Sequence, residues 1–279
     1  QFKYFLDRCP HMSVDFIIAR PRMALYMKVS AQIYRVYLKY IAPEDIHVYS
    51  IDEAFLDLSG MGTSEQLTDY CRKMVRHIGK GTGIPISLGI APTKTLAKIA
   101  SHFAKTYKGY KGVCMIDTEA KRLKALELTP IEDVWGVGRR LAPRMQAAGI
   151  KTALDYVGRP QKWVNANFNL PGLRTWSELQ GRACIEDEKE ERRKSICTSR
   201  SFADMISDED ELCLRVSDFA AMCAHKLREE GSAATEVTTF LYTNRFREDM
   251  DQYFPSATIR LAVAANSTHE IVGTAIKAF

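Results

Sequence analysis

One segment of the chain consists entirely of charged residues. Residues 186–194 read Glu-Asp-Glu-Lys-Glu-Glu-Arg-Arg-Lys. Such a run is typical of a solvated linker or surface, because it offers nothing to bury in a core. The chain has 279 residues, and single domains usually have about 100–200 residues. The sequence therefore predicts more than one hydrophobic core, with residues 186–194 between folded units.

Hydrophobic periodicity predicts a mixed α+β fold on both sides of this segment. Before it, the expected order is helix 22–40, a strand pair or hairpin over 47–58, helix 64–78, a glycine turn at 79–83, strand 84–90, helix 92–107, strand 112–116 and helix 139–148. After it, the expected order is strand 195–202, helix 209–230, strands 236–243 and 257–263, and helix 269–278.

Composition excludes several classes of protein. No uncharged apolar stretch reaches the roughly 18 residues that would predict a transmembrane helix, and residues 1–10 lack the order of a signal peptide. The seven cysteines form no C-x-x-C pair, so no zinc site is predicted and the thiols are expected to be reduced. The net charge of +5 permits a polyanionic partner without requiring one. We expect a cytoplasmic protein with no membrane partner.

Two adjacent carboxylates, Asp52 and Glu53, interrupt the apolar stretch 47–58. Neighbours on a regular strand point to opposite faces, whereas at a bend both side chains can reach one site. Two carboxylates suit Mg²⁺, which prefers one or two of them together with substrate phosphates. A bare Asp-Glu pair is more often a solvated strand end, so the pair taken alone favours that interpretation over a metal site.

A second candidate site combines glycines with arginines. Gly136 and Gly138 permit a sharp turn, and a helix is expected to begin at Arg139, next to Arg140. Free amides at a helix start bind phosphate, and the arginines add positive charge. The pattern favours contact with a DNA backbone, which is independent of base sequence and sensitive to salt. The alternative is a plain turn between two helices.

Four blocks, taken together and in order, resemble the Y-family DNA polymerases. They are Ser50-Ile-Asp-Glu-Ala-Phe-Leu-Asp57, the stretch 87–101, Asp133-Val-Trp-Gly-Val-Gly-Arg-Arg140 and Ser195-Ile-Cys-Thr-Ser-Arg-Ser-Phe202. The third and fourth blocks are most similar to the UmuC branch. The resemblance runs from about residue 22 to residue 279.

This resemblance implies a multidomain right-hand architecture. Residues 1–117 correspond to a palm with part of the fingers, and residues 118–185 to a small helical thumb with a helix-hairpin-helix. Residues 186–194 correspond to the linker, and residues 195–279 to an α+β little finger.

The resemblance also implies roles for single residues. Asp52 and Glu53 would be catalytic ligands of a two-metal Mg²⁺ site, Asp52 beside the incoming nucleotide and Glu53 beside the primer 3′-hydroxyl. Lys105 corresponds to the lysine of the family that contacts the triphosphate. Three residues are expected to contact template phosphates: Thr198, Ser199 and Arg200.

The sequence departs from the family pattern near its ends. A further metal-binding Asp is expected on a strand that would precede this chain, so one ligand, much of the fingers and the C-terminal tail are expected to be missing. Asp7 and Asp15 are candidate substitutes. Asp15 superficially resembles the missing motif but lies where the family has a connecting segment, so it is not favoured.

The function implied is template-directed DNA synthesis past lesions, in DNA repair and SOS damage tolerance. Expected partners are primer-template DNA and deoxynucleoside triphosphates, with a sliding clamp, a UmuD-like accessory subunit and a recombinase filament as further ones. One alternative is a catalytically inactive DNA-binding fragment or degenerate paralogue. A helix-hairpin-helix repair nuclease would explain residues 135–150 but not the blocks at 50–55 and 87–101.

Overall fold

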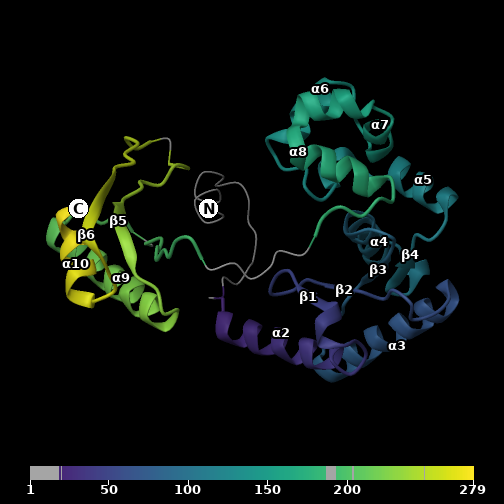
Figure 1. Cartoon of the computed structure of the whole chain (residues 1–279), viewed down its shortest axis with the longest axis horizontal. Helices are drawn as coiled ribbons and strands as arrows, with labels where there is room; N and C mark the ends of the chain where they lie inside the picture. The colour runs from purple at the N-terminus through teal and green to yellow at the C-terminus, as the bar shows by residue number, and fades with distance from the viewer. Residues whose placement is uncertain (1–18, 20, 187–192, 203, 248) are drawn as a thin grey trace, which may run out of the picture. The chain divides into compact units, whose positions relative to one another are not determined.

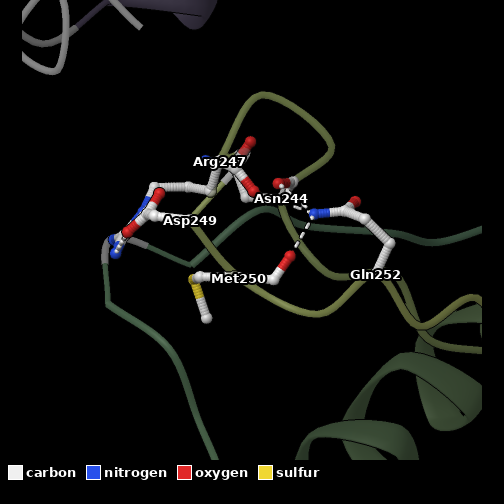
Figure 2. Close-up of polar contacts among 5 residues, drawn as sticks. All are labelled: Asn244, Arg247, Asp249, Met250 and Gln252. Atoms are coloured by element: carbon white, nitrogen blue, oxygen red, sulfur yellow. Dashed lines mark hydrogen bonds and ion pairs between the residues drawn. The ribbon is translucent and has the colours of Figure 1, made fainter.

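A computed structural model of the chain describes residues 19, 21–186, 193–202, 204–247 and 249–279. The described residues fall into two compact units, one drawn from residues 18–189 and the other from residues 190–279. Both units combine helices with strands, which confirms the α+β class (Figure 1). The predicted division at residue 117 lies inside the first unit and stays a prediction.

The first half of the first unit contains two pairs of short strands and three α-helices. Its elements are α2 (Met23–Tyr37), η1 (Pro43–Asp45), β1 (Ile46–Val48), β2 (Ala54–Leu56), α3 (Ser64–Thr82), β3 (Leu88–Ile90), α4 (Lys94–Thr106), η2 (Lys108–Tyr110) and β4 (Val113–Met115). Strands β1 and β2 pair antiparallel, which confirms the expected hairpin. Strands β3 and β4 pair parallel, with α4 as the connection between them.

Helix α3 runs further than the glycines in its sequence suggested. It begins with a capping box, in which the Thr63 hydroxyl accepts from the Gln66 amide and the Gln66 side chain accepts from the Thr63 amide. The expected turn at 79–83 is wrong, because the helix continues through Gly79 and Gly81. It ends at Gly83, whose φ of 72° is left-handed. A glycine stops a helix when it takes this conformation, whereas in the helix interior it only costs about 1 kcal/mol.

Helix α4 packs unusually close to strand β3. A Cβ atom built on Gly89 would lie 2.1 Å from the carbonyl oxygen of Ala97 and 2.2 Å from the amide nitrogen of Ser101. Only glycine therefore permits this approach. The helix begins at the N-cap Thr93, whose hydroxyl accepts from the Leu96 amide at 3.3 Å. This packing determines where the side chains of α4 lie relative to the strands.

The second half of the first unit is helical. Its elements are α5 (Glu119–Leu128), η3 (Ile131–Asp133), α6 (Leu141–Ala147), α7 (Ala153–Val157) and α8 (Gln161–Leu179) (Figure 1). A single buried cluster contains residues of α4 and of these helices, including Leu96, Phe103, Met145, Tyr156 and Leu179. Helix α4 is thus part of the same core as the helical half.

The second unit packs two helices with one strand pair. Its elements are α9 (Glu209–Glu229), β5 (Ala234–Phe240), β6 (Ser256–Ala265) and α10 (Thr268–Lys277) (Figure 1). Strands β5 and β6 pair antiparallel, with a register shift between Ala234 and Glu236. Ala224 of α9 and Ile271 of α10 belong to the small core between the helices.

The strand expected at 195–202 is wrong. None of these residues is in a strand, and among the described residues β5 pairs only with β6. The segment is held by side chains of α9 instead of by a backbone ladder. The unit therefore reads α-β-β-α where β-α-β-β-α was expected.

None of the helices in the described part of the chain combines the length and apolar character needed to cross a bilayer.

Candidate functional site

Asp52 and Glu53 lie in the loop that joins β1 to β2. The carbonyl oxygen of Glu53 accepts from the amides of Tyr49 and Ser50, both at 3.0 Å, which closes the loop. The Ser50 hydroxyl donates to Asp52 Oδ1 at 2.5 Å. Both acids are exposed. The carboxylates therefore sit at a bend, the arrangement in which neighbouring acids can serve one site.

The Glu53 side chain extends from this loop to helix α4. Its Oε1 atom lies 2.6 Å from Nζ of Lys98, and the side chains of Lys98 and Glu53 are 27% and 43% exposed, respectively. The pair is therefore half-open to solvent. It joins the carboxylate loop to a helix that follows β3.

Glu53 and Lys105 line the same cavity, which has a volume of about 360 Å³. The other lining residues are Lys98, Ile99, Ser101, His102, Phe103, Tyr107, Leu128, Thr129, Pro130, Asp133 and Trp135. Lys98, His102 and Lys105 follow at helical spacing, so they share one face of α4. Cavities that hold small ligands usually measure about 300–1,000 Å³, so this one is large enough for part of a nucleotide. Asp52 does not belong to its lining.

An aromatic cluster connects the carboxylate loop to the glycine-arginine segment. The Trp135 ring centroid lies 5.5 Å from those of Tyr49 and Phe55, and the Tyr49 and Phe55 centroids lie 5.9 Å apart. Aromatic pairs at these distances add to the stability of a contact beyond the area that they bury. The cluster holds the loop that carries Asp52 and Glu53 against Trp135, the residue that precedes Gly136.

The glycine-arginine segment forms a tight turn before α6. Gly136 has a φ of 94°, and a Cβ atom there would lie 2.8 Å from Oγ1 of Thr175. The carbonyl oxygen of Gly138 accepts from the amides of the first two residues of α6. The helix therefore begins at Leu141, two residues later than expected, because Arg139 and Arg140 belong to the turn.

Arg139 and Arg140 are exposed. Neither side chain makes a hydrogen bond or an ion pair with any described residue, so both guanidinium groups are available to a partner. The predicted contact with phosphate at this turn stays a prediction.

Thr198, Ser199 and Arg200 belong to the second unit. The Thr198 hydroxyl lies 3.2 Å from Nζ of Lys226 and 3.3 Å from Sγ of Cys223, both on α9. Ser199 and Arg200 are exposed, and Arg200 donates to the carbonyl oxygen of Ser199 at 2.8 Å. Within the second unit, an ammonium group therefore lies beside Thr198.

Sequence reasoning missed Lys98 as the partner of Glu53. Its spacing of seven residues from Lys105 along a predicted helix could have indicated that the two lysines share a face. The candidate substitutes Asp7 and Asp15 lie outside the described residues.

Two family models and several curated proteins match this chain. The model of the impB/mucB/samB family matches residues 2–102, and the model of the C-terminal domain of the same family matches residues 193–279. Protein UmuC of Salmonella typhimurium is 37% identical over 234 residues, which cover 83% of this chain and 56% of UmuC. Protein MucB of Escherichia coli is 32% identical over 274 residues, which cover 95% of this chain and 65% of MucB. The chain thus spans less than two thirds of the length of these relatives.

Solved structures show the same fold. A Y-family DNA polymerase chimera of Dbh and Dpo4 matches with a TM-score of 0.65 and 20% identity, over 92% of this chain and 70% of the chimera. DinB from Sulfolobus solfataricus matches with a TM-score of 0.53 and 19% identity, over 99% of this chain and 76% of that protein. At such low identity these matches show the fold alone. The family models and the UmuC and MucB relatives show that the chain belongs to the impB/mucB/samB family, a UmuC-like group with the fold of the Y-family DNA polymerases.

Proposed function

We propose that this chain forms part of the catalytic region of a template-directed DNA polymerase that copies past damaged template bases. The observation that carries the proposal is the shared cavity of Glu53 and Lys105, which have 51 residues between them in the sequence and come from different elements. A carboxylate and an ammonium group that line one cavity suit a nucleotide triphosphate. The carboxylate can bind the metal ion that the phosphates carry, and the ammonium group can bind the remaining phosphate oxygens. The relatives UmuC and MucB support the same assignment.

The proposed domains follow the resemblance to the family. Residues 1–117 would form the palm with part of the fingers, and residues 118–185 the thumb with its helix-hairpin-helix. Residues 186–194 would form the linker, and residues 195–279 the little finger. The isolated β-bridge between Pro130 and Thr152 supports the hairpin, because it pairs the segment before the glycine turn with the N-cap residue of α7.

Y-family polymerases use divalent metal ions, and the residues present fit part of such a site. The described residues contain no group of three His, Cys, Asp or Glu side chains that could hold an ion. Asp52 and Glu53 nevertheless suit Mg²⁺, which takes one or two carboxylates and completes its shell with waters and substrate phosphates. When bound, two such ions stabilise the attacking and leaving oxygens of the displacement. Asp52 and Glu53 would hold them, and a further Asp ligand stays a prediction.

The protein's own contribution is positioning and charge. Lys105 and Lys98 would bind the triphosphate along one face of α4, with His102 between them. The ion pair of Glu53 with Lys98 and the aromatic cluster around Trp135 hold the carboxylate loop in place beforehand. In phosphoryl transfer such preorganisation is the main source of rate, because the protein does little covalent chemistry itself.

The DNA would be bound through its backbone. Gly136, Gly138, Arg139 and Arg140 would contact duplex phosphates at the thumb, and Thr198, Ser199 and Arg200 would contact the template strand. Contacts of this type hold the duplex without reading its sequence. The sliding clamp, a UmuD-like subunit and a recombinase filament stay predicted partners.

Substitution of Lys105 tests the nucleotide assignment. In Lys105→Met we expect the KM for the incoming nucleotide to rise about tenfold or more, as for the loss of a charge-assisted hydrogen bond, with unchanged DNA affinity. Lys108→Met is the matched control, because Lys108 is exposed and absent from the cavity lining. Equal KM values for Lys105→Met and Lys108→Met would show that Lys105 does not bind the nucleotide.

A further inference from the structure

The ion pair between Glu53 and Lys98 lies at the cavity itself. Glu53 Oε1 and Lys98 Nζ are 2.6 Å apart, and both residues line the cavity. A proposed metal ligand thus carries a protein cation on one of its two oxygens. Any other cation that takes this oxygen must compete with the lysine.

The ammonium group of Lys98 also has other neighbours in the cavity besides Glu53. Its ammonium group lies 5.9 Å from the Tyr49 ring centroid, and His102 and Lys105 follow on the same face of the helix. Lysine has a flexible four-carbon stem, so its charge can move while the helix stays in place. Released from Glu53, the ammonium would remain in a cavity that already presents Lys105.

We propose that Lys98 is a resident counter-ion that keeps the Glu53 carboxylate turned into the cavity, yields that carboxylate to a divalent cation and then binds the phosphate oxygens of the nucleotide. This inference rests on the proposed function, because it assigns a role to Lys98 in the same site. It makes Lys98 a positioning residue in the free protein and a ligand of the triphosphate in the complex.

Removal of the lysine charge should change two affinities in opposite directions, that for a divalent ion and that for the nucleotide. Without Lys98, Glu53 has no competing cation, so a divalent ion binds the free protein more tightly. Without Lys98, the cavity also loses a positive charge that faces the triphosphate, so the nucleotide binds less tightly. A lysine that only stabilised the fold would weaken both interactions or neither.

The experiment uses Lys98→Met and two probes. Mn²⁺ binding to the protein without nucleotide is measured by electron paramagnetic resonance, and dATP binding in the presence of Ca²⁺ by calorimetry. We expect Mn²⁺ to bind roughly two- to fivefold more tightly, which corresponds to about 0.4–1 kcal/mol for a half-exposed ion pair. We expect dATP to bind about tenfold more weakly.

Two further variants control for charge and folding. Lys121→Met removes the lysine of another ion pair, in which Lys121 Nζ lies 2.6 Å from Asp117 Oδ1. Neither residue of this pair lines the cavity. It should leave both affinities unchanged, so a gain in Mn²⁺ affinity here would show a general effect and overturn the proposal. Lys98→Arg keeps a cation and should stay close to the wild-type protein for both ligands.

Equal or weaker Mn²⁺ binding in Lys98→Met overturns the proposal. The variant Glu53→Gln separates this failure from failure of the proposed function. If Glu53→Gln loses Mn²⁺ while Lys98→Met behaves like the wild type, only the role of Lys98 is wrong. If the wild type and Glu53→Gln bind Mn²⁺ equally and dATP does not bind, the proposed function fails together with this inference.

Discussion

The carboxylate of Glu178 accepts a hydrogen bond from the backbone amide of Thr95, 83 residues away in the sequence, at 3.1 Å. Its other oxygen accepts from the amides of Cys184 and Ile185 at 2.8 and 3.1 Å. The residue is 1% exposed, so this acid is satisfied by backbone donors instead of by a cation. A negative charge at the start of α4 is also favoured by the helix dipole. Glu178 therefore joins α8, the chain after α8 and the helix that carries Lys98 and Lys105.

Replacement of Glu178 by Gln should destabilise the first unit. A Gln side chain presents an NH₂ group to one of the amide donors in either orientation, which leaves at least one buried amide without an acceptor. We expect the free energy of unfolding to fall by about 1–3 kcal/mol, measured by urea denaturation. Glu132→Gln is the control, since Glu132 is exposed and accepts from Gln146. Equal effects of the two substitutions would show that the buried contact contributes little.

Asp155 should make stability depend on pH. Hydrogen bonds from the backbone amides of Lys151 and Thr152 lower the pKa of Asp155 in the folded protein. A lowered folded pKa stabilises the protein above the unfolded value of about 3.9, and this contribution disappears as the pH falls through the folded pKa. We expect Asp155→Ala to cost about 1 kcal/mol near pH 7, as for the loss of a helix cap, and less at pH 3.

Urea denaturation of the wild type and of Asp155→Ala at several pH values between 7 and 3 measures this dependence. Asp155→Asn is the matched control, because it keeps an acceptor oxygen without the charge. Its difference from Asp155→Ala should be independent of pH. A difference between wild type and Asp155→Ala that grows toward acid pH would contradict the assignment.

Arg139 and Arg140 should contribute to DNA affinity through charge alone. In the double variant Arg139→Gln, Arg140→Gln we expect weaker binding on all DNA sequences and a salt slope that is smaller by about 1–2, since each lost phosphate contact contributes about 0.9. Fluorescence anisotropy at several salt concentrations measures both. The variant Lys73→Gln, Lys80→Gln removes the same charge from exposed positions on α3 and should change the slope less. A loss confined to particular sequences would indicate base contacts instead.

Local signals in the sequence predicted many of the elements around the site. The hairpin that carries Asp52 and Glu53 was predicted because a partly alternating stretch lies between Pro43 and Gly60. The helix that carries Lys105 was predicted over residues 92–107 from hydrophobic periodicity, and the structure has it as α4. These features depend on near neighbours in the chain, which a sequence shows directly.

Features that depend on distant contacts were not predicted. The segment 195–202 has the composition of a strand, but a strand also needs a partner, and the described residues supply none. The end of α3 depended on which of several glycines takes a positive φ. The pairing of Glu53 with Lys98 depends on how closely α4 approaches β3 at Gly89. No local pattern contains this information.

Primer extension on a template with an abasic site, in Mg²⁺, tests the central claim most directly. For the natural protein we predict extension past the lesion, and in Asp52→Asn and Glu53→Gln a loss of at least about 100-fold with retained DNA binding. Asp57→Asn is the control, because Asp57 belongs to the same motif but follows β2, where its carboxylate accepts from the Ser59 amide and an Asn oxygen can do the same. Two results would contradict the account. One is undiminished extension by Asp52→Asn and Glu53→Gln, and the other is a natural protein that binds the DNA but does not extend the primer.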